Sequence, residues 1–425
     1  MKVLVIGGGG REHAICWGLS RSPSVTKVWA TPGNPGIAKV AECLKPPSPD
    51  PGGYWAVAEA IGADLTVVGP EAPLVAGTAN LFRSRGKLVV GPSAAAAQLE
   101  GSKIFAKRVM DRFGVPTAKF VTVDTEPAAL DALRSFGFPV VLKADGLAAG
   151  KGVIIVQNRQ EAEAAIHGLL SGELVGKAGA RLVIEEFLQG EEVSFIALSD
   201  GTDVLPLEPT QDHKAVFDGD RGPNTGGMGA YCDSRILTAD QTQQALDRVI
   251  KPVIDGLRAD GTPFTGFLYA GLMMTSAGVK VLEFNVRLGD PESQALLHRM
   301  DGDFGAVLKA AAAGELRNAK FAWRPKPSVC VVMASAGYPS TPKTGDLIEG
   351  IECAERLGAT VFHAGTKSGE DGLVTAGGRV LGVTASGETL AAAIEHSYSA
   401  VSKIHFDGMH YRHDIGAKGL KRWLA

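Results

Sequence analysis

The strongest constraint on the fold is a short apolar strand that runs directly into four consecutive glycines. The chain begins MKVLVIGGGGREHAICWGLSRS, in which KVLVI has the composition of a β-strand and REHAICWGLS that of a helix. A strand, a glycine turn and a helix in this order are typical of an α/β domain. The apolar runs KVWAT, DLTVVG and KLVVG follow, separated by helical stretches and by a proline-rich loop at 46–53. This alternation predicts an open parallel sheet over roughly the first hundred residues.

The chain of 425 residues is too long for one hydrophobic core, so we expect two to four domains. Residues 93–114 have the pattern of one helical stretch. Strands are predicted at FPVVLKAD, VIIVQ and RLVIEEFL, with EEVSFIALSDG pairing after the last of them. FTGFLYAGLMMT and VKVLEFNVR have the pattern of a hairpin, whereas residues 211–230 are predicted to form a long glycine-rich loop. RPKPS (324–328) is a linker, and the strands and helix after it predict a small α+β domain.

Charge and cysteine content exclude several classes of function. Lys and Arg total 43 against 46 Asp and Glu, and no long basic run occurs, so neither nucleic acid nor an anionic membrane is expected as a partner. The five cysteines lack CxxC spacing, which argues against zinc and disulfides and favours a reducing compartment. No apolar stretch is long enough to span a bilayer, and the N-terminus lacks the apolar core of a signal peptide. We therefore expect a cytoplasmic protein.

The first glycine cluster, GGGGREH (7–13), has two interpretations of about equal weight. A helix that starts after such a turn can bind phosphate with its backbone N–H groups. The other interpretation is a tight turn alone. The dinucleotide pattern GxGxxG is not met, because Glu12 or His13 stands where the third glycine should be. A nicotinamide cofactor is therefore doubtful.

A second glycine cluster, DGLAAGKGV (145–153), lies between two predicted strands. It differs from a Walker A loop, because Asp145 stands at the first glycine position and Gly152 follows Lys151. A glycine-rich hairpin with lysines can fold over phosphates, and Lys143 on the entering strand can contact phosphate oxygens. Taken alone, the motif is more typical of a surface hairpin.

The acidic stretch IEEFLQGEEVS (184–194) offers a strand edge for a base and, at Glu192, a carboxylate for two ribose hydroxyls. Taken alone, it is more typical of a solvated acidic edge. His213 lies beside Asp212 and Lys214, where a solvated or structural role is favoured over catalysis.

The stretch EFNVR (283–287) carries the clearest chemistry. Residues two apart on a strand share one face, so Glu283, Asn285 and Arg287 point the same way. A carboxylate and an amide oxygen suit Mg²⁺, which takes few protein ligands and shares the rest with phosphates and water. Arg287 beside them can hold an anionic group. The apolar run VKVL before them indicates a buried strand rather than a polar surface.

In this order, a lysine strand, a glycine flap, an acidic hinge and a Glu-x-Asn strand resemble the ATP-grasp superfamily. Within it, the chain resembles the phosphoribosylamine–glycine ligase family over nearly its whole length, and RLGDPE is highly specific to that family. The stretches that carry the resemblance are VIGGGGREHA, GNPG (33–36), GPEAPLVAG (69–77), QLEGSKIFAK (98–107), KADGLAAGKGV (143–153), EEFLQGEEVSF (185–195), QDHKAVFDGDRGPNTGGMGAY (211–231), RLGDPESQ (287–294) and YRHDIG (411–416).

The resemblance implies a chain of mixed α/β and α+β class with three domains. They are an N-terminal open parallel α/β domain (1–101), a two-lobed ATP-grasp core (102–325) with a mobile flap lobe at about 120–190, and a small C-terminal α+β domain (326–425). The implied reaction joins glycine to 5-phosphoribosylamine with ATP, through glycyl phosphate, and gives glycinamide ribonucleotide, ADP and phosphate in purine biosynthesis. The implied metal is Mg²⁺ or Mn²⁺, and a monomer or weak homodimer is expected.

The resemblance also assigns residues. Arg287 and Lys143 are implied as catalytic, and Glu283 and Asn285 as metal ligands. ATP is expected near Lys103, Lys143, Gly150, Gly152, Glu185, Glu186, Phe187, Leu188 and Glu192. The other substrates are expected near Gly9, Gly10, Asn34, Pro35, Gly36, Glu71, Asp212, Lys214, Asn224, Thr225, Gly227, Met228, Gly229, Arg287, Asp290, Pro291 and Glu292.

The sequence departs from the superfamily pattern at one point, and three alternative functions stay open. Many ATP-grasp enzymes carry another metal-binding acid on the preceding strand, and GFLYAGLMM (266–274) has none, which puts a second metal in doubt. The alternatives are a ligase with another amine acceptor, a nicotinamide oxidoreductase and a non-catalytic nucleotide sensor.

Overall fold

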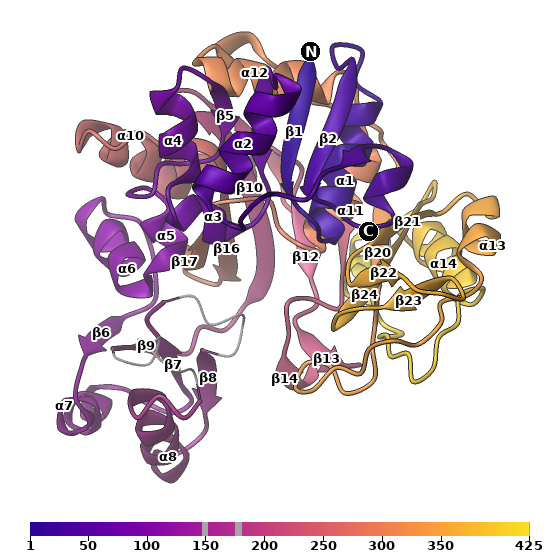
Figure 1. The fold of residues 1–425 in the computed structure, drawn as a ribbon. Coiled ribbons are helices and arrows are strands. Elements are labelled where there is room, and N and C mark those ends of the chain that lie inside the picture. The colour runs from indigo at the N-terminus through magenta and orange to yellow at the C-terminus, as the bar shows by residue number, and fades with distance from the viewer. Residues whose placement is uncertain (147–151, 175–180, 425) are drawn as a thin grey trace.

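A computed structural model describes residues 1–146, 152–174 and 181–424 (Figure 1). Its first sheet is open and fully parallel, with strand order β3-β2-β1-β4-β5, as the sequence predicts. The strands are β1 (Lys2–Gly7), β2 (Lys27–Pro32), β3 (Glu42–Cys43), β4 (Leu65–Val68) and β5 (Leu88–Val90). The helices of this region are α1 (Gly10–Ser20), η1 (Ile37–Lys39), α2 (Pro51–Ile61), α3 (Glu71–Val75) and α4 (Thr78–Ser84).

Two local predictions in this region are wrong. Residues 46–53 are not all loop, because α2 begins at Pro51, and the Asp50 carboxylate caps it by accepting from the N–H of Gly53 at 2.8 Å. Proline suits the first helical position because its missing N–H has no partner there in any case. The helical stretch predicted at 93–114 begins only at Gln98, and it is divided into α5 (Gln98–Gly101) and α6 (Lys103–Arg112) by Ser102, which is extended and caps α6.

A four-stranded antiparallel sheet forms a separate lobe, at the lower left of Figure 1. Its order is β6-β9-β7-β8, and it has its own small hydrophobic core. The elements are β6 (Phe120–Val123), α7 (Glu126–Ala132), η2 (Leu133–Ser135), β7 (Val140–Ala144), β8 (Val153–Val156), α8 (Arg159–Leu170) and β9 (Leu182–Glu186).

A larger sheet runs from the centre of the molecule into its C-terminal part. Its order is β17-β16-β10-β12-β15-β20-β24-β21, with β11 paired to β10. The central strands are β10 (Glu191–Asp200), β11 (Val204–Pro206), β12 (Thr210–Asp212), β15 (Gly229–Cys232), β16 (Thr265–Thr275) and β17 (Gly278–Asn285). The predicted hairpin of β16 and β17 is confirmed.

The predicted pairing of β9 with β10 is wrong, because the two strands belong to different sheets. Gly190 lies between them, and a Cβ atom there would stand 2.2 Å from the carbonyl oxygen of Met274. The backbone at residue 190 therefore passes so close to β16 that only glycine, which has no Cβ atom, fits there.

The segment 211–230 is richer in strand than predicted. Besides β12 and β15 it contains the hairpin of β13 (Ala215–Phe217) and β14 (Arg221–Asn224). Five glycines among residues 219–229 conceal the alternation from sequence reasoning.

The C-terminal part adds three strands to the large sheet, and α14 packs against two of them, β20 and β24 (Figure 1). Its elements are β20 (Ser328–Ala334), α13 (Ile351–Arg356), β21 (Thr360–His363), β22 (Thr366–Ser368), β23 (Leu373–Thr375), β24 (Arg379–Ser386), α14 (Leu390–Val401) and η6 (Ala417–Trp423). The remaining elements are α9 (Ala239–Ala245), the π-helical turn η4 (Leu246–Ile250), α10 (Lys251–Ala259), α11 (Glu292–Arg299), β18 (Met300–Asp301), α12 (Phe304–Ala313), η5 (Leu316–Asn318) and β19 (Ala322–Trp323). Within the described residues, no helix combines the length and apolar composition needed to cross a membrane.

The parallel sheet and the large sheet meet at a glycine contact. Gly266 near the start of β16 has a φ of +121°, and a Cβ atom there would lie 2.9 Å from the backbone nitrogen of Gly91. We expect Gly266→Ala to lower the free energy of unfolding by about 1–3 kcal/mol from backbone strain, with a further loss from the clash. Urea unfolding measures this loss.

Gly261 provides the matched control. Its φ is +74°, but no atom lies within 4 Å of the position of its Cβ. Gly261→Ala should therefore show only the strain, about 1 kcal/mol. Equal losses in the two variants would contradict the close approach of the two sheets.

Candidate active site

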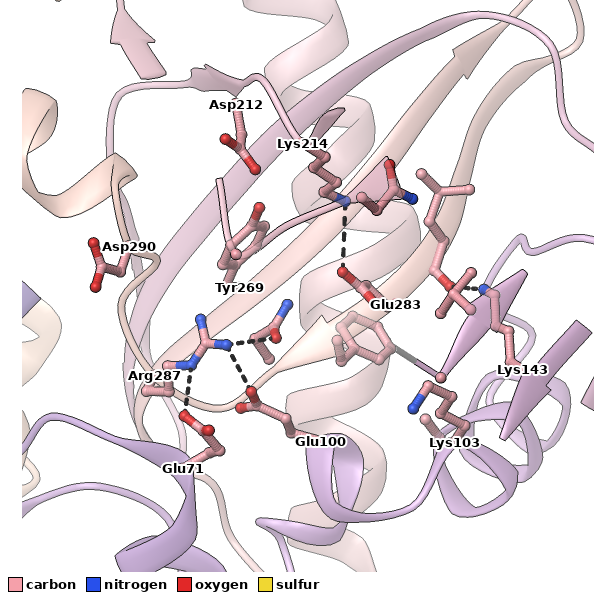
Figure 2. A pocket seen from close by; sticks show the side chains of 18 of the residues that line it. Glu71, Glu100, Lys103, Lys143, Asp212, Lys214, Tyr269, Glu283, Arg287 and Asp290 are labelled. Atoms are coloured by element: carbon pink, nitrogen blue, oxygen red, sulfur yellow. Dashed lines mark hydrogen bonds and ion pairs between the residues drawn. The ribbon is translucent and has the colours of Figure 1, made fainter. Parts of the chain in front are cut away.

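A cavity of about 730 Å³ lies where all three parts of the chain meet, and we call it the central cavity (Figure 2). Most of its polar lining is charged. The charged and amide groups are Arg11, Glu71, Glu100, Lys103, Lys107, Lys143, Glu185, Asp212, Lys214, Asn224, Glu283, Asn285, Arg287, Asp290, Glu292 and Arg379. This composition suits a polyanionic ligand together with a small zwitterion.

The end of β17 places its polar face in the cavity, as the alternation predicts. Glu283, Asn285 and Arg287 all line it, whereas Phe284 and Val286 are buried in the core. The Glu283 carboxylate lies 3.6 Å from the Lys214 ammonium. Burial alone would raise the pKa of Glu283, but Lys214, Lys143 and Lys103 lower it to about 2. Glu283 is therefore ionised at neutral pH.

Arg287 is held by two acids rather than standing free. Its Nη2 atom lies 2.7 Å from Oε1 of Glu100 and donates to Oδ1 of Asn285 at 2.9 Å, and its Nε atom lies 3.5 Å from Glu71 (Figure 2). The second oxygen of Glu100 accepts from the N–H of Val286 at 2.8 Å. Burial would lower the pKa of Arg287, but Glu100 and Glu71 raise it. Glu100 was missed as a site residue, because its only signal is its place in QLEGSK.

Lysines line the opposite side of the cavity. The carboxylate of Glu185 is buried between the amino groups of Lys107 and Lys143, 2.9 Å from each. Lys143 also donates to the carbonyl of Leu282 at 2.9 Å, and Lys103 donates to the carbonyl of Gly146 at 3.0 Å. Burial lowers the pKa of Lys107 to about 8 in spite of Glu185. With Lys214, four amino groups face one cavity, an arrangement suited to phosphate oxygens.

The other residues expected near ATP are distributed unevenly. Gly152 lines the cavity, whereas Gly150 lies outside the described residues. Glu192 pairs with Lys214, and Glu186 pairs with Lys280 at 2.9 Å, but neither is among the lining residues. Leu188 is buried and Phe187 is exposed.

Three carboxylates, those of Asp212, Asp290 and Glu292, line the cavity together with Arg379, and we call them the acidic group. Glu292 accepts from the hydroxyls of Tyr269 at 2.6 Å and Ser194 at 3.1 Å. Burial, and then the charge of Glu292, raise the pKa of Asp212. Asp290 forms an ion pair with Arg379 at 3.1 Å. Three carboxylates in one place suit an ammonium group.

Arg379, which sequence reasoning missed, brings the C-terminal part into the site. Besides its ion pair with Asp290, its Nη1 atom donates to the carbonyls of Gly226 and Asp290, each at 2.6 Å. It thereby joins the 224–229 turn to the RLGDPE turn. Asn224 and Thr225 of the first turn line the cavity, whereas the other expected residues of the two turns, Gly227, Met228, Gly229 and Pro291, do not.

The first glycine cluster packs against the RLGDPE turn. A Cβ atom on Gly10 would lie 2.6 Å from the Gln294 amide and 3.5 Å from Asp290, and one on Gly9 would lie 3.8 Å from Asp290. The N–H of Gly9 donates to the Glu12 carboxylate at 2.6 Å. The structure therefore favours the tight turn, because the chain's own acid occupies this donor.

The GNPG loop lies at the junction with the C-terminal part, and its expected substrate residues Asn34, Pro35 and Gly36 are not among those that line the central cavity. The Asn34 amide donates to the carbonyls of Gly8 at 2.9 Å and His363 at 2.8 Å. Gly36 packs against the rings of His363 and His13.

His213 is fully buried, so the solvated role considered for it is wrong. Its ring nitrogens lie 3.3 Å from the carbonyl of Gly229 and 3.4 Å from the backbone nitrogen of Gly416. Burial lowers the pKa of His213 to about 4, so the ring is neutral at pH 7. Its contacts support a structural role that joins the 211–230 segment to the C-terminal segment.

The donor set at the end of β17 fits a hard divalent cation that brings other ligands with it. Glu283 and Asn285 offer oxygen donors on one face. Among the residues that the structure describes, no group of three or more His, Cys, Asp or Glu side chains is arranged for a metal. Opposite Asn285 on β16 stands Tyr269, which offers no carboxylate. Any cation here therefore needs ligands from phosphate or water.

Comparisons with known proteins agree along the whole chain. Profiles described as the N domain, the ATP-grasp (A) domain and the C domain of phosphoribosylglycinamide synthetase match residues 1–100, 101–293 and 328–418. Phosphoribosylamine–glycine ligase of Xylella fastidiosa strain 9a5c is 49% identical over 426 residues, which cover 99% of this chain and 97% of the relative. The ligase of Pseudomonas aeruginosa is 48% identical over 425 residues, with 99% of each chain covered. The crystal structure of phosphoribosylamine–glycine ligase from Thermotoga maritima has a TM-score of 0.86 at 34% identity and covers 98% of this chain and 100% of that chain.

The histidines beside the GNPG loop predict a pH dependence of stability. Burial lowers the pKa of His13 to about 3 and that of His363 to about 4, and the backbone N–H of His363 donates to Nδ1 of the His13 ring at 2.8 Å. As the pH falls below about 6.5, the unfolded chain takes up these protons before the folded one. The stabilisation is therefore complete above pH 6.5 and is lost as the pH falls toward 4 for His363 and toward 3 for His13.

We expect His363→Gln to reduce the loss of unfolding free energy between pH 7 and pH 5 by roughly 1–2 kcal/mol. Thermal or urea unfolding at several pH values measures this dependence. His405→Gln is the control, because the His405 side chain is 64% exposed. An unchanged pH dependence in His363→Gln would contradict the role of this buried pair.

Proposed function

The chain belongs to the phosphoribosylglycinamide synthetase family, and we propose that it joins glycine to 5-phosphoribosylamine with ATP, giving glycinamide ribonucleotide, ADP and phosphate. It is an ATP-grasp carbon–nitrogen ligase of purine biosynthesis. The observation that carries the proposal is the central cavity, in which Glu283 and Asn285 face four lysines at the meeting point of all three parts of the chain.

The nucleotide is proposed to lie along the lysine side of the cavity. Lys103, Lys143 and Lys214 would contact its phosphates. Glu186 at the end of β9, Leu188 in the β9–β10 connection and Glu192 at the start of β10 would contact its base and ribose. Glu283 and Asn285 would hold Mg²⁺ or Mn²⁺, which when bound neutralises charge on the phosphates. The lowered pKa of Glu283 supports this assignment, because a metal ligand must be ionised.

The chemical problem is that a carboxylate is a poor electrophile toward an amine. A carboxylate oxygen of glycine would attack the γ-phosphorus, forming glycyl phosphate and releasing ADP. The amine of phosphoribosylamine would then attack the carbonyl carbon, and phosphate would leave with the glycine oxygen. The residues of the chain mainly position the reactants and stabilise the charge that develops on oxygen.

Arg287 and the acidic group would orient the reacting molecules. Arg287 is committed to Glu100, Glu71 and Asn285 through Nη2 and Nε, and its Nη1 atom donates to the carbonyl of Leu288 at 3.2 Å. Nη1 carries a second N–H, which we assign to the glycine carboxylate or the transferred phosphoryl group. Asp290 and Glu292 would hold the ammonium of glycine or fix the turn around it.

Phosphoribosylamine would enter from the side of the first domain, where Arg11 and Glu71 line the cavity. We propose a monomer or weak homodimer, as the family resemblance implies. The three family profiles support domains at 1–101, 102–325 and 326–425 that close one site together. We propose a cytoplasmic location on the unpaired state of all five cysteines.

Glycine labelled with ¹⁸O in its carboxylate tests the reaction and its order. Sustained ADP release should require ATP, glycine and phosphoribosylamine together, and each phosphate released should carry one labelled oxygen. The label moves because the carboxylate oxygen bonds to phosphorus before its bond to carbon breaks. Mass spectrometry of the phosphate measures the transfer.

Two results would count against this scheme. Unlabelled phosphate would exclude glycyl phosphate. Full ADP release with a different amine in place of phosphoribosylamine would favour the alternative, a ligase with another acceptor.

Glu100 provides a test of how Arg287 is held. Glu100→Gln keeps the size of the side chain and the acceptor for the N–H of Val286 but removes the ion pair with Arg287. We expect turnover to fall by roughly 10–100-fold, as for other residues that orient a ligand-binding group. Steady-state kinetics measure the loss.

Glu126→Gln is the control for Glu100→Gln, because it also neutralises one glutamate but lies in the separate lobe, on α7. It should keep wild-type turnover. Wild-type turnover in Glu100→Gln would show that Arg287 needs no second anchor.

A further inference from the structure

The last turn of the chain packs on the large sheet behind the central cavity. Arg422 on η6 forms an ion pair with Glu191 and donates to the hydroxyl of Tyr231 at 3.0 Å. Beside it, the Trp423 indole donates to Asp233 at 2.7 Å. These contacts join residues about 190 to 231 positions apart in the sequence. The family profile for the C domain ends at residue 418, so Arg422 lies beyond the matched part.

The contact falls where two strands of the sheet separate. Within the described residues, β10 and β12 share one backbone pair, Ser194 with Thr210. Next to this pair, the side-chain amide of Gln211 on β12 takes the place of further backbone hydrogen bonds between β12 and β10. It donates to the carbonyl of Glu192 at 2.8 Å and to the carboxylate of Glu191 at 3.0 Å.

Arg422 and Tyr231 complete the bridge that Gln211 makes. The Tyr231 hydroxyl donates to the amide oxygen of Gln211, and Arg422 lies 3.4 Å from the same oxygen. Arg422 also pairs with Glu191, which accepts from Gln211. One guanidinium therefore contacts both the strand residue and the amide that bridges to it, and its rigid planar fork fixes the two contacts in one geometry.

Strand alternation places this network on the opposite face from the site. Glu191 and Gln211 face η6, whereas their neighbours Glu192 and Asp212 face the other way. Asp212 lines the central cavity, and Glu192 pairs with Lys214, which lies 3.6 Å from Glu283. A shift of the bridge would therefore move the backbone that carries both residues.

We propose that Arg422 is a positioning residue for the nucleotide site, acting through Glu191 and Gln211 on Glu192 and Asp212. This inference rests on the proposed function, because that function assigns Glu192 to the nucleotide. The proposal gives η6 a role in positioning the residues that hold ATP.

The test uses direct binding of a non-hydrolysable ATP analogue, adenylyl imidodiphosphate with Mg²⁺, measured by calorimetry on the full chain. Arg422→Met removes the guanidinium at similar volume. We expect its dissociation constant to rise roughly tenfold, the lower end of the effect of removing a supporting hydrogen bond. In steady-state assays KM for ATP should rise with it, whereas KM for glycine and for phosphoribosylamine should stay within about twofold of wild type.

Two further variants separate positioning from simple docking of η6. Lys418→Met removes an ion pair with Asp220, 2.7 Å long, from the same helix without touching the bridge, and it should bind the analogue as wild type does. Arg422→Ala should recover affinity when millimolar guanidinium is added. Arg422→Lys should recover only part of the affinity, because an ammonium on a flexible stem lacks the rigid planar fork that holds Glu191 and Tyr231 in one geometry.

The outcomes are distinct. An unchanged dissociation constant in Arg422→Met, an equal loss in Lys418→Met, or failure of guanidinium to restore Arg422→Ala would each overturn the positioning role while leaving the proposed function intact. Failure of the wild-type chain to bind the analogue would overturn the proposed function and this inference with it.

Discussion

The ion pair between Arg287 and Glu100 is the interaction on which the site depends most. Glu100 comes from the end of the first domain, and its two oxygens hold both the side chain of Arg287 and the backbone just before it. Arg287 in turn orients the amide oxygen of Asn285. One carboxylate therefore fixes the end of β17, where the candidate metal ligands lie. A second arginine, Arg379, makes the corresponding connection from the C-terminal part through Asp290. The cavity is closed by arginine–carboxylate pairs that cross domain borders.

The balance of charge explains how so many ionised groups share one cavity. An unpaired buried charge is strongly unfavourable, so such charges occur in pairs or networks. Glu185 lies between two lysines, Arg287 between two acids, and Glu283 faces Lys214. A negatively charged nucleotide bound as proposed, on the lysine side, would meet amino groups already held in place. The protein therefore has little to reorganise when phosphate charge arrives, which is the condition for effective electrostatic stabilisation.

Local sequence patterns predicted the parts of the fold that are set by interactions between residues close together in the chain. The glycine turn after an apolar strand, the parallel α/β order and the β16–β17 hairpin follow from periodicity and turn chemistry, and all three are confirmed. Errors arose where a single residue redirects the chain. Ser102 divides a continuous helical pattern, and Gly190 sends β10 to a different sheet from β9. Many other serines and glycines do not interrupt a helix or redirect a strand, so the residue type alone does not predict these two changes.

The sequence by itself determined the face of β17 that carries Glu283 and Asn285, because alternation along a strand is a property of the backbone. It also determined the family, because the ordered motifs resemble it over nearly the whole chain. Only the tertiary structure decided which charges meet. Glu100 and Arg287 are 187 positions apart, and Arg379 meets Asp290 across 89. Likewise, only the fold placed Arg422 behind Glu192. Ion pairs between distant segments leave no periodic trace in the sequence, because their geometry is set by how whole sheets pack and not by any local repeat.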